Sequence, residues 1–199
     1  TAAIFYAIIN LAKAGDEIVA ADNLYGGTTT QFNDILPQFG IRTRFVSPAD
    51  PENFERAING ETRAIFVETL GNPSLDVVDL SAVARIAKRH RLPLLVDNTF
   101  ATPYLCRPIE HGADIVVHSL TKWIGGHGTF IGGIIVDSGK FAWTDPKFAF
   151  FSEWEPSYQR MLRLGYRVFP AFGSDSHDAT SPRNRSAARN GATLCWVKA

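Results

Sequence analysis

The sequence predicts an α/β fold with three layers, in which helices cover both faces of a mainly parallel β-sheet. Short apolar runs that suit strands alternate along the chain with helical patterns, an order typical of strand–helix–strand units. Several of these runs are almost continuously apolar, as expected for parallel strands buried on both faces. At 199 residues, the chain is long enough for one sizeable domain and too short for two full α/β domains.

Turn residues separate the expected elements at regular intervals. Strands are predicted over residues 16–22, 41–47, 63–69, 92–98, 113–119 and 130–137. Helices are predicted over residues 1–15, 28–40, 51–58 and 79–90. Pro37 and Gly40 mark the end of the second helix, and Pro51 marks the start of the third.

The first and last of these helices have apolar faces with the i, i+3/i+4 spacing of a buried helix. In the first helix, which is expected to stop at Gly15, this face comprises Ala3, Ile4, Ala7, Ile8 and Leu11. In the last helix it comprises Leu80, Val83, Ala84 and Ala87. Both helices are therefore expected to pack against the sheet.

Composition excludes several classes of protein. Lys+Arg and Asp+Glu both total 20, so the net charge is zero and the isoelectric point about 6.9. This balance gives no basic surface for nucleic acid or an anionic membrane, and no run approaches the ~18 apolar residues of a membrane span. The two cysteines, Cys106 and Cys195, supply neither a disulfide framework nor zinc-ligand spacing, which favours a reducing, cytoplasmic location.

The two ends of the chain differ from its middle. The sequence begins with Thr1 directly in a helical pattern, so it is expected to be a segment of a longer polypeptide. Residues 173–191 contain three alanines as their only apolar side chains, a composition typical of a linker or of disorder. We therefore expect a domain over residues 1–160 and a divergent, poorly ordered tail over residues 161–199.

Side chains that can bind a ligand or take part in catalysis follow four of the predicted strands. In open parallel sheets, ligands bind beyond the carboxyl ends of the strands, so these side chains are expected to lie together. They are Tyr25, Asn72, Asp97, Thr99, Ser119, Thr121 and Lys122. The glycine fingerprints of dinucleotide and nucleoside triphosphate sites are absent from the sequence, which argues against those cofactors.

Pyridoxal 5′-phosphate is a cofactor that requires this set. Its aldehyde needs a lysine, here Lys122, and its ring nitrogen needs a carboxylate, here Asp97. Its flat ring stacks on an aromatic side chain such as Tyr25. Its phosphate binds hydroxyl and backbone N–H groups, which Ser119 and Thr121 would supply.

Longer stretches carry a family resemblance. ADNLYGGT, VETLGNPSLDVVDL, LLVDNTFATPYL and GADIVVHSLTKWIGGHG resemble the Cys/Met-metabolism family of pyridoxal-phosphate enzymes, whose large domain has the fold type I, aspartate aminotransferase-like architecture. The resemblance covers roughly residues 1–160. GHGTFIGGIIVDSGKF and FSEWEPSY most resemble the O-acetylhomoserine sulfhydrylase branch of that family.

The resemblance implies a role for each matching residue. Lys122 matches the Schiff-base lysine, and Ser119 and Thr121 match the phosphate-binding hydroxyls beside it. Asp97 matches the partner of the pyridine nitrogen, and Tyr25 the stacking tyrosine that also assists departure of the γ-substituent.

Other residues of the same motifs complete the implied site. Asn72 matches a residue near the cofactor's phenolic oxygen, and Glu68 and Thr99 belong to the same motifs with weaker support. The family's phosphate loop, its Tyr-x-Arg segment and its small C-terminal domain have no counterpart in this sequence.

The implied activity is γ-replacement on O-acetyl-L-homoserine by sulfide or a thiol, giving homocysteine- or methionine-type products. The expected partners are an amino-acid substrate, sulfide or a thiol, and further copies of the chain in a dimer of dimers. Cystathionine γ-synthase and methionine γ-lyase share Lys122, Asp97 and Tyr25, so both stay open as alternatives. So does a truncated, catalytically silent cofactor domain.

Taken singly, the same residues have ordinary explanations. A lone lysine after a strand is usually a surface charge, and a lone Asp or Ser usually caps a turn. His118 and His127 lack a surrounding set of carboxylate or thiol ligands, so no metal site is predicted. Cys106 is expected to be a packed small side chain.

Overall fold

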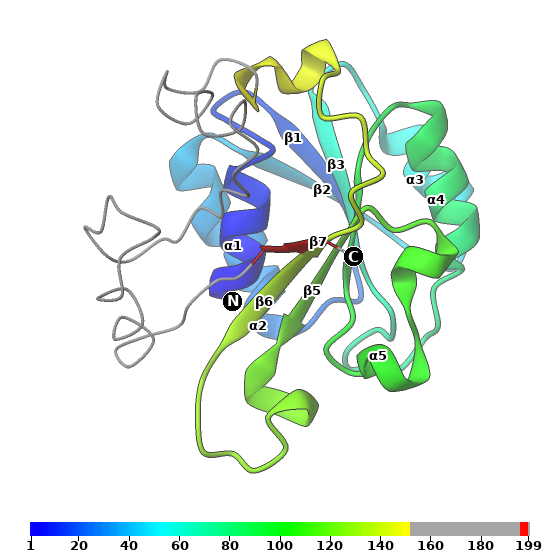
Figure 1. Ribbon diagram of the computed structural model, residues 1–199. Helices are drawn as coiled ribbons and strands as arrows, with labels where there is room; N and C mark the ends of the chain where they lie inside the picture. Colours follow the sequence, from blue (N-terminus) through cyan, green and yellow to red (C-terminus); the bar gives the residue numbers. More distant parts are fainter. Residues whose placement is uncertain (152–195, 199) are drawn as a thin grey trace.

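In the computed structural model, residues 1–151 and 196–198 are described. Within them, seven strands form one sheet in the order β2-β1-β3-β4-β5-β6-β7, shown edge to edge in Figure 1. Every neighbouring pair is parallel except β5 with β6. The strands are β1 Glu17–Ala21, β2 Arg42–Val46, β3 Thr62–Glu68, β4 Leu94–Asp97, β5 Ile115–Ser119, β6 Gly133–Asp137 and β7 Trp196–Lys198.

The predicted mainly parallel sheet is therefore confirmed, with six strands at the expected places and one at residues 196–198. That last strand falls in the segment expected to be a poorly ordered tail. The rest of that tail lies outside the described residues, as does the FSEWEPSY segment beyond Phe151.

Helices cover both faces of the sheet, as Figure 1 shows. On one face lie α1 (Ala2–Ile9) and the helical stretch formed by α2 (Gly26–Thr30), η1 (Gln31–Ile35) and η2 (Leu36–Phe39). On the other lie α3 (Glu52–Ala57) and α4 (Leu80–Arg89). Short helical turns follow the later strands: α5 (Thr102–Leu105), η3 (Pro108–His111), η4 (Leu120–Ile124) and η5 (Pro146–Phe151).

The first helix is shorter than its apolar pattern predicts. It ends at Ile9, and the Asn10 side chain turns back to donate a hydrogen bond to the Tyr6 carbonyl at 2.7 Å. Asparagine competes with the helix for such backbone groups. The chain turns before Gly15, but Leu11 still lies buried in the core. The second helix ends at Gly40 as predicted, with the left-handed φ of 74° that glycine favours.

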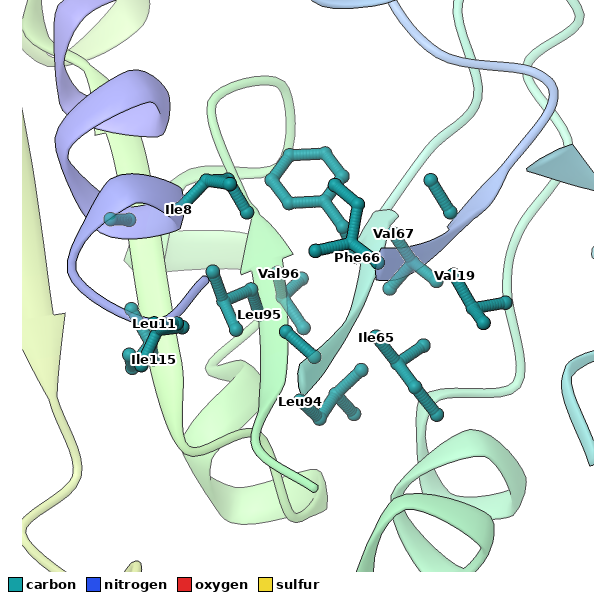
Figure 2. Close-up of a cluster of buried hydrophobic side chains, with 14 of the residues drawn as sticks. Ile8, Leu11, Val19, Ile65, Phe66, Val67, Leu94, Leu95, Val96 and Ile115 are labelled. Atoms are coloured by element: carbon teal, nitrogen blue, oxygen red, sulfur yellow. The ribbon is translucent and has the colours of Figure 1, made fainter. Parts of the chain in front are cut away.

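The core lies on both faces of the central strands. Phe66 from β3, Leu95 from β4 and Ile8 from α1 belong to one cluster of buried side chains, shown in Figure 2. All three are fully buried. On the last predicted helix, Leu80, Val83 and Ala87 are buried as expected, whereas Ala84 is only partly buried.

None of the helices in the described part of the chain has the length and apolar character to cross a bilayer.

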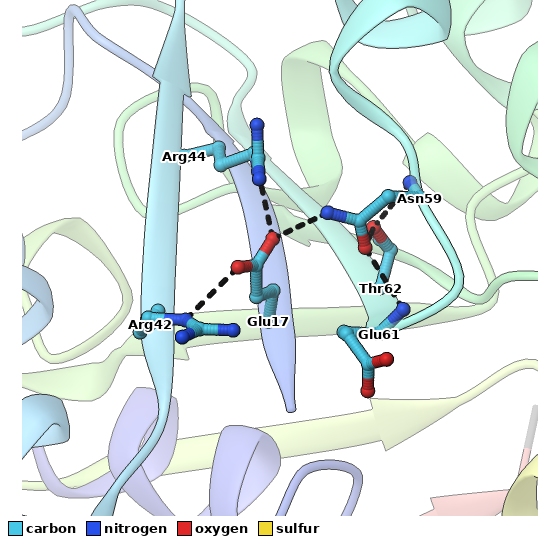
Figure 3. Close-up of polar contacts among 6 residues, drawn as sticks. All are labelled: Glu17, Arg42, Arg44, Asn59, Glu61 and Thr62. Carbon is cyan, nitrogen blue, oxygen red and sulfur yellow. Dashed lines mark hydrogen bonds and ion pairs between the residues drawn. The ribbon is translucent and has the colours of Figure 1, made fainter. Parts of the chain in front are cut away.

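A charged cluster joins the first three strands at their amino ends, shown in Figure 3. Glu17 is only 4% exposed, and its carboxylate accepts hydrogen bonds from Arg44 and Asn59, both at 2.7 Å. Arg42 pairs with its other oxygen at 2.9 Å. The hydrogen bond from Arg44 is the main cause that holds the pKa of Glu17 below its ordinary value.

We expect Glu17→Ala to lower the free energy of unfolding by about 1–3 kcal/mol, because Asn59 and the two guanidinium groups lose their acceptor. Urea denaturation at neutral pH measures the effect. Glu61→Ala is the matched control, since Glu61 is an exposed glutamate of the same cluster whose side chain makes none of these bonds. Equal stability of the two variants would contradict the assignment.

Candidate active site

The carboxyl ends of β1, β3, β4 and β5 meet at one edge of the sheet, the lower edge in Figure 1, together with α2 and α5. A cavity of about 860 Å³ lies there, within the usual size range of small-molecule sites. The eight residues that the sequence proposed for a cofactor site all line it: Tyr25, Glu68, Asn72, Asp97, Thr99, Ser119, Thr121 and Lys122. The predicted juxtaposition is therefore present in the structure.

Asp97 is held by the residue two positions later in the chain. The Thr99 N–H donates to the Asp97 carboxylate at 2.8 Å, and the Thr99 hydroxyl accepts from the Ser119 N–H at 2.8 Å. Thr99 thus connects the ends of β4 and β5. Burial raises the pKa of Asp97 above its ordinary value, while the hydrogen bonds from Thr99 oppose that rise.

Glu68 ends β3 directly beside Asp97, because the two residues are register partners in the parallel pair β3–β4. Its carboxylate accepts the Tyr25 backbone N–H at 2.8 Å. Burial is the main cause that raises the pKa of Glu68 to about 7; the Tyr25 N–H lowers it and the Asp97 carboxylate raises it again. Two carboxyl groups therefore share one wall of the cavity.

Lys122 lies on η4, where its backbone (φ −96°, ψ −126°) departs from helical geometry. Its side chain is exposed at the cavity. The neighbouring Thr121 hydroxyl bonds the backbone of Gly132 twice, accepting from the N–H at 3.1 Å and donating to the carbonyl at 3.3 Å. Thr121 therefore fixes the glycine-rich loop over the cavity as well as lining it.

Among the cavity residues that were not assigned to the site from the sequence are two aromatic residues and a histidine. Phe100 and Trp123 form an aromatic pair at its wall, with ring centroids 6.3 Å apart. Each directly follows a predicted site residue, which was the available signal. His118, considered above only as a metal ligand, also lines the cavity, and its buried Nδ1 has no hydrogen-bond partner among the described residues.

The remaining candidates from the sequence lie elsewhere or form no cluster. Cys106 is partly buried, and burial is the main cause that raises the pKa of its thiol. Over residues 1–151 and 196–198, no group of three or more His, Cys, Asp or Glu side chains is arranged to hold a metal ion. Cys195 lies outside the described residues.

The fold and cavity are those of an α/β enzyme that binds a small ligand at the carboxyl edge of its sheet. The family model for "Cys/Met metabolism PLP-dependent enzyme" matches residues 1–170. The chain belongs to this family, whose cofactor is pyridoxal phosphate.

Individual relatives agree with this assignment. The O-acetyl-L-homoserine sulfhydrylase of Leptospira meyeri is 52% identical over 167 residues, which are 84% of this chain and 37% of that protein. The structure of O-acetylhomoserine sulfhydrylase from Wolinella succinogenes matches with a TM-score of 0.70 and 39% identity, over 82% of this chain and 49% of the other.

A second solved structure contains the cofactor. The putative O-acetylhomoserine (thiol)-lyase of Campylobacter jejuni, described with N′-pyridoxyl-lysine-5′-monophosphate, matches with a TM-score of 0.65 and 43% identity. The match covers 66% of this chain and 32% of the other. The present chain thus spans less than half the length of each of these three relatives.

The side chains present suit pyridoxal phosphate. A lysine amine, a carboxylate and an aromatic ring line one cavity. Burial raises the pKa of Asp97 because it disfavours the charged form, and the hydrogen bonds from Thr99 and the N-terminal ammonium only partly oppose that rise. A protonated ring nitrogen beside Asp97 would favour its charged form further.

The raised pKa of Glu68 has a consequence for stability. The folded protein holds this proton up to about pH 7, whereas the unfolded chain releases it near the ordinary value of 4.5. Stability from Glu68 is therefore fully present below about pH 4.5 and is lost as the pH rises to 7. Relative to Glu68→Gln, the wild-type protein should lose about 2–3 kcal/mol between about pH 5 and about pH 8.

Denaturant unfolding of both proteins at several pH values measures this difference. The exposed Glu52 provides the control, because Glu52→Gln makes the same chemical change away from the cavity. If the stability of the wild-type protein and that of Glu68→Gln change with pH in parallel, Glu68 has the same pKa in the folded and unfolded chains, and the prediction is wrong.

Proposed function

We propose that the protein catalyses γ-replacement on O-acetyl-L-homoserine, with sulfide or a thiol as the second substrate and a homocysteine- or methionine-type product. The observation that carries the proposal is that Lys122, Asp97 and Tyr25 line the same cavity. The chain is also 52% identical over 167 residues to a protein named for this reaction. The activity belongs to the metabolism of sulfur amino acids, and we propose a cytoplasmic location for it.

Each proposed cofactor contact uses an atom at the cavity. The Lys122 amine would bind the aldehyde carbon. The Asp97 carboxylate would accept a hydrogen bond from the protonated ring nitrogen, while the N–H of Thr99 holds that carboxylate in place. The Tyr25 ring, 51% exposed, offers a face for stacking. Ser119, Thr121 and Asn72 line the same space and would bind the phosphate and the phenolic oxygen.

Bound there, pyridoxal phosphate would supply an electron sink for negative charge at the substrate's α-carbon. The chain's own residues would then move the protons. The Lys122 amine, once free, would take the α-proton and carry protons between Cα and Cβ. Tyr25, which lines the same cavity, would assist departure of acetate from Cγ. Phe100 and Trp123 would shield the reacting atoms from water.

The proposed assembly is a homo-oligomer, a dimer of dimers in the full-length protein. Large apolar side chains are exposed around the cavity, and a patch of this kind commonly marks a protein interface. They include Phe100, Tyr104, Leu105, Trp123 and Ile131, of which Tyr104 is 92% exposed. A second copy of the chain is the proposed partner for this surface.

Product analysis tests the proposed activity against its alternatives. The purified protein is incubated with pyridoxal phosphate, O-acetylhomoserine and sulfide, and homocysteine is the expected product. Cystathionine formed from added cysteine would favour a γ-synthase, and breakdown of methionine would favour a γ-lyase. Cofactor binding without any turnover would identify a catalytically silent cofactor domain.

Lys122→Ala should abolish covalent attachment of the cofactor. After incubation with pyridoxal phosphate and reduction by borohydride, intact-mass spectrometry should show the added cofactor on the wild-type protein and none on the variant. Lys140→Ala removes another exposed lysine and should keep the adduct. A Lys122→Ala protein that retains both the adduct and turnover would refute the assignment.

Asp97→Ala should keep cofactor binding and lose most of the turnover, by about a hundredfold or more, because the ring nitrogen loses the group that keeps it protonated. Fluorescence titration measures the binding, and homocysteine formation measures the rate. Near-normal turnover in this variant would show that another group serves the ring nitrogen.

A further inference from the structure

Glu68 makes a contact that its motif does not explain. It lies at the end of β3, 7% exposed, and its Oε1 accepts the backbone N–H of Tyr25 at 2.8 Å. The two residues are 43 positions apart in the chain, so this bond fixes the loop after β1 against the end of β3. Tyr25 is one of the aromatic residues that line the cavity.

The backbone of Tyr25 is held on both sides. Its N–H binds Glu68, and its carbonyl accepts the N–H groups of Thr28 and Thr29 at 2.8 and 2.9 Å. The ring lies over Gly27, where an added Cβ would come within 2.6 Å of Tyr25 Cε1. The absence of a side chain at Gly27 therefore leaves room for the ring, and these three hydrogen bonds of the Tyr25 backbone fix the position of the Cα that carries it.

The ring itself has little packing to hold it, since half of its residue surface is exposed. The position of the Tyr25 ring therefore depends on the hydrogen bonds of its backbone more than the position of a fully packed ring would. Placing a carboxylate at the end of β3 is costly, because it is buried and adjoins Asp97 on β4. A costly buried carboxylate that is bonded to the ring-bearing residue points to a role in the site.

We infer that Glu68 is a positioning residue, whose carboxylate holds the Tyr25 ring over the cofactor cavity by accepting the Tyr25 backbone N–H. The inference rests on the proposed cofactor site and adds to it a residue that acts through Tyr25. The acceptor oxygen is what matters for this role, so an amide at the same place serves equally well.

Two substitutions of matched length separate the acceptor from the side-chain volume. Glu68→Met keeps the length and removes the acceptor, whereas Glu68→Gln keeps both the length and an acceptor oxygen. Asp114→Asn is the control: Asp114 also accepts a backbone N–H, from Leu94 at 2.9 Å, and burial raises its pKa to about 6. It lies at the opposite, amino end of β5.

Hydrogen exchange tests the anchor without the cofactor. Exchange at the Tyr25 amide should become about tenfold faster in Glu68→Met and stay within about threefold of wild type in Glu68→Gln and Asp114→Asn. Unchanged exchange in Glu68→Met would overturn the inference, whatever the protein does with pyridoxal phosphate.

Affinity for pyridoxal 5′-phosphate, measured by tryptophan fluorescence, tests the consequence. Glu68→Met should weaken binding about tenfold, Glu68→Gln should restore it, and Glu68→Met should add nothing in a Tyr25→Ala background. Additive effects of the two substitutions would overturn the inference. Absence of binding by the wild-type protein would instead reject the proposed cofactor function, and the exchange experiment would still decide the anchor.

Discussion

The site depends on the in-register pairing of β3, β4 and β5. Parallel strands end at one edge of a sheet, and the pairing aligns Glu68 with Asp97 and Asp97 with Val117. Because the apolar residues of these strands are buried in the core, packing against the core fixes their register. A shift of one residue would turn every side chain to the other face and would separate the carboxylates from the cavity.

The pairing also brings two buried carboxyl groups together, each with its own backbone donor. Tyr25 donates to Glu68, and Thr99 donates to Asp97. Neither donor carries a full charge, so burial still raises the pKa of both groups. The cavity wall is therefore suited to a cationic ligand atom, since a positive charge beside Asp97 would stabilise the form that burial disfavours.

Most of the sheet could be predicted from the sequence, as could eight of the side chains that line the cavity, because continuous apolar runs and the residues after them carry that information locally. The direction of β6 could not, since an apolar run is the same for parallel and antiparallel pairing. The predicted end of the first helix at Gly15 was wrong, because the apolar pattern continues to Leu11 whereas the helix ends at Ile9, where the Asn10 side chain bonds back to the Tyr6 carbonyl.

Contacts between segments that are distant in the chain could not be predicted from the sequence either. The bond from Tyr25 to Glu68 spans 43 positions, and the pairing of Phe100 with Trp123 depends on how two loops meet. The family motifs identified which residues belong together, but motifs record residue types rather than bonds. Glu68 accordingly had weak support from the sequence, and the structure supplies its contact.

Two glutamates of the same sheet illustrate how position determines the effect of a buried charge. Glu17 at the amino end of β1 faces Arg42, Arg44 and Asn59, and its pKa is lowered. Glu68 at the carboxyl end of β3 faces an acid and a single amide, and its pKa is raised. The first stabilises the fold at neutral pH, whereas the second costs stability there. Of these two glutamates, the one that stabilises the fold lies in an ion-pair cluster at the amino end of the sheet, and the costly one lines the cavity at the carboxyl end, as expected when an active site is built on a rigid scaffold.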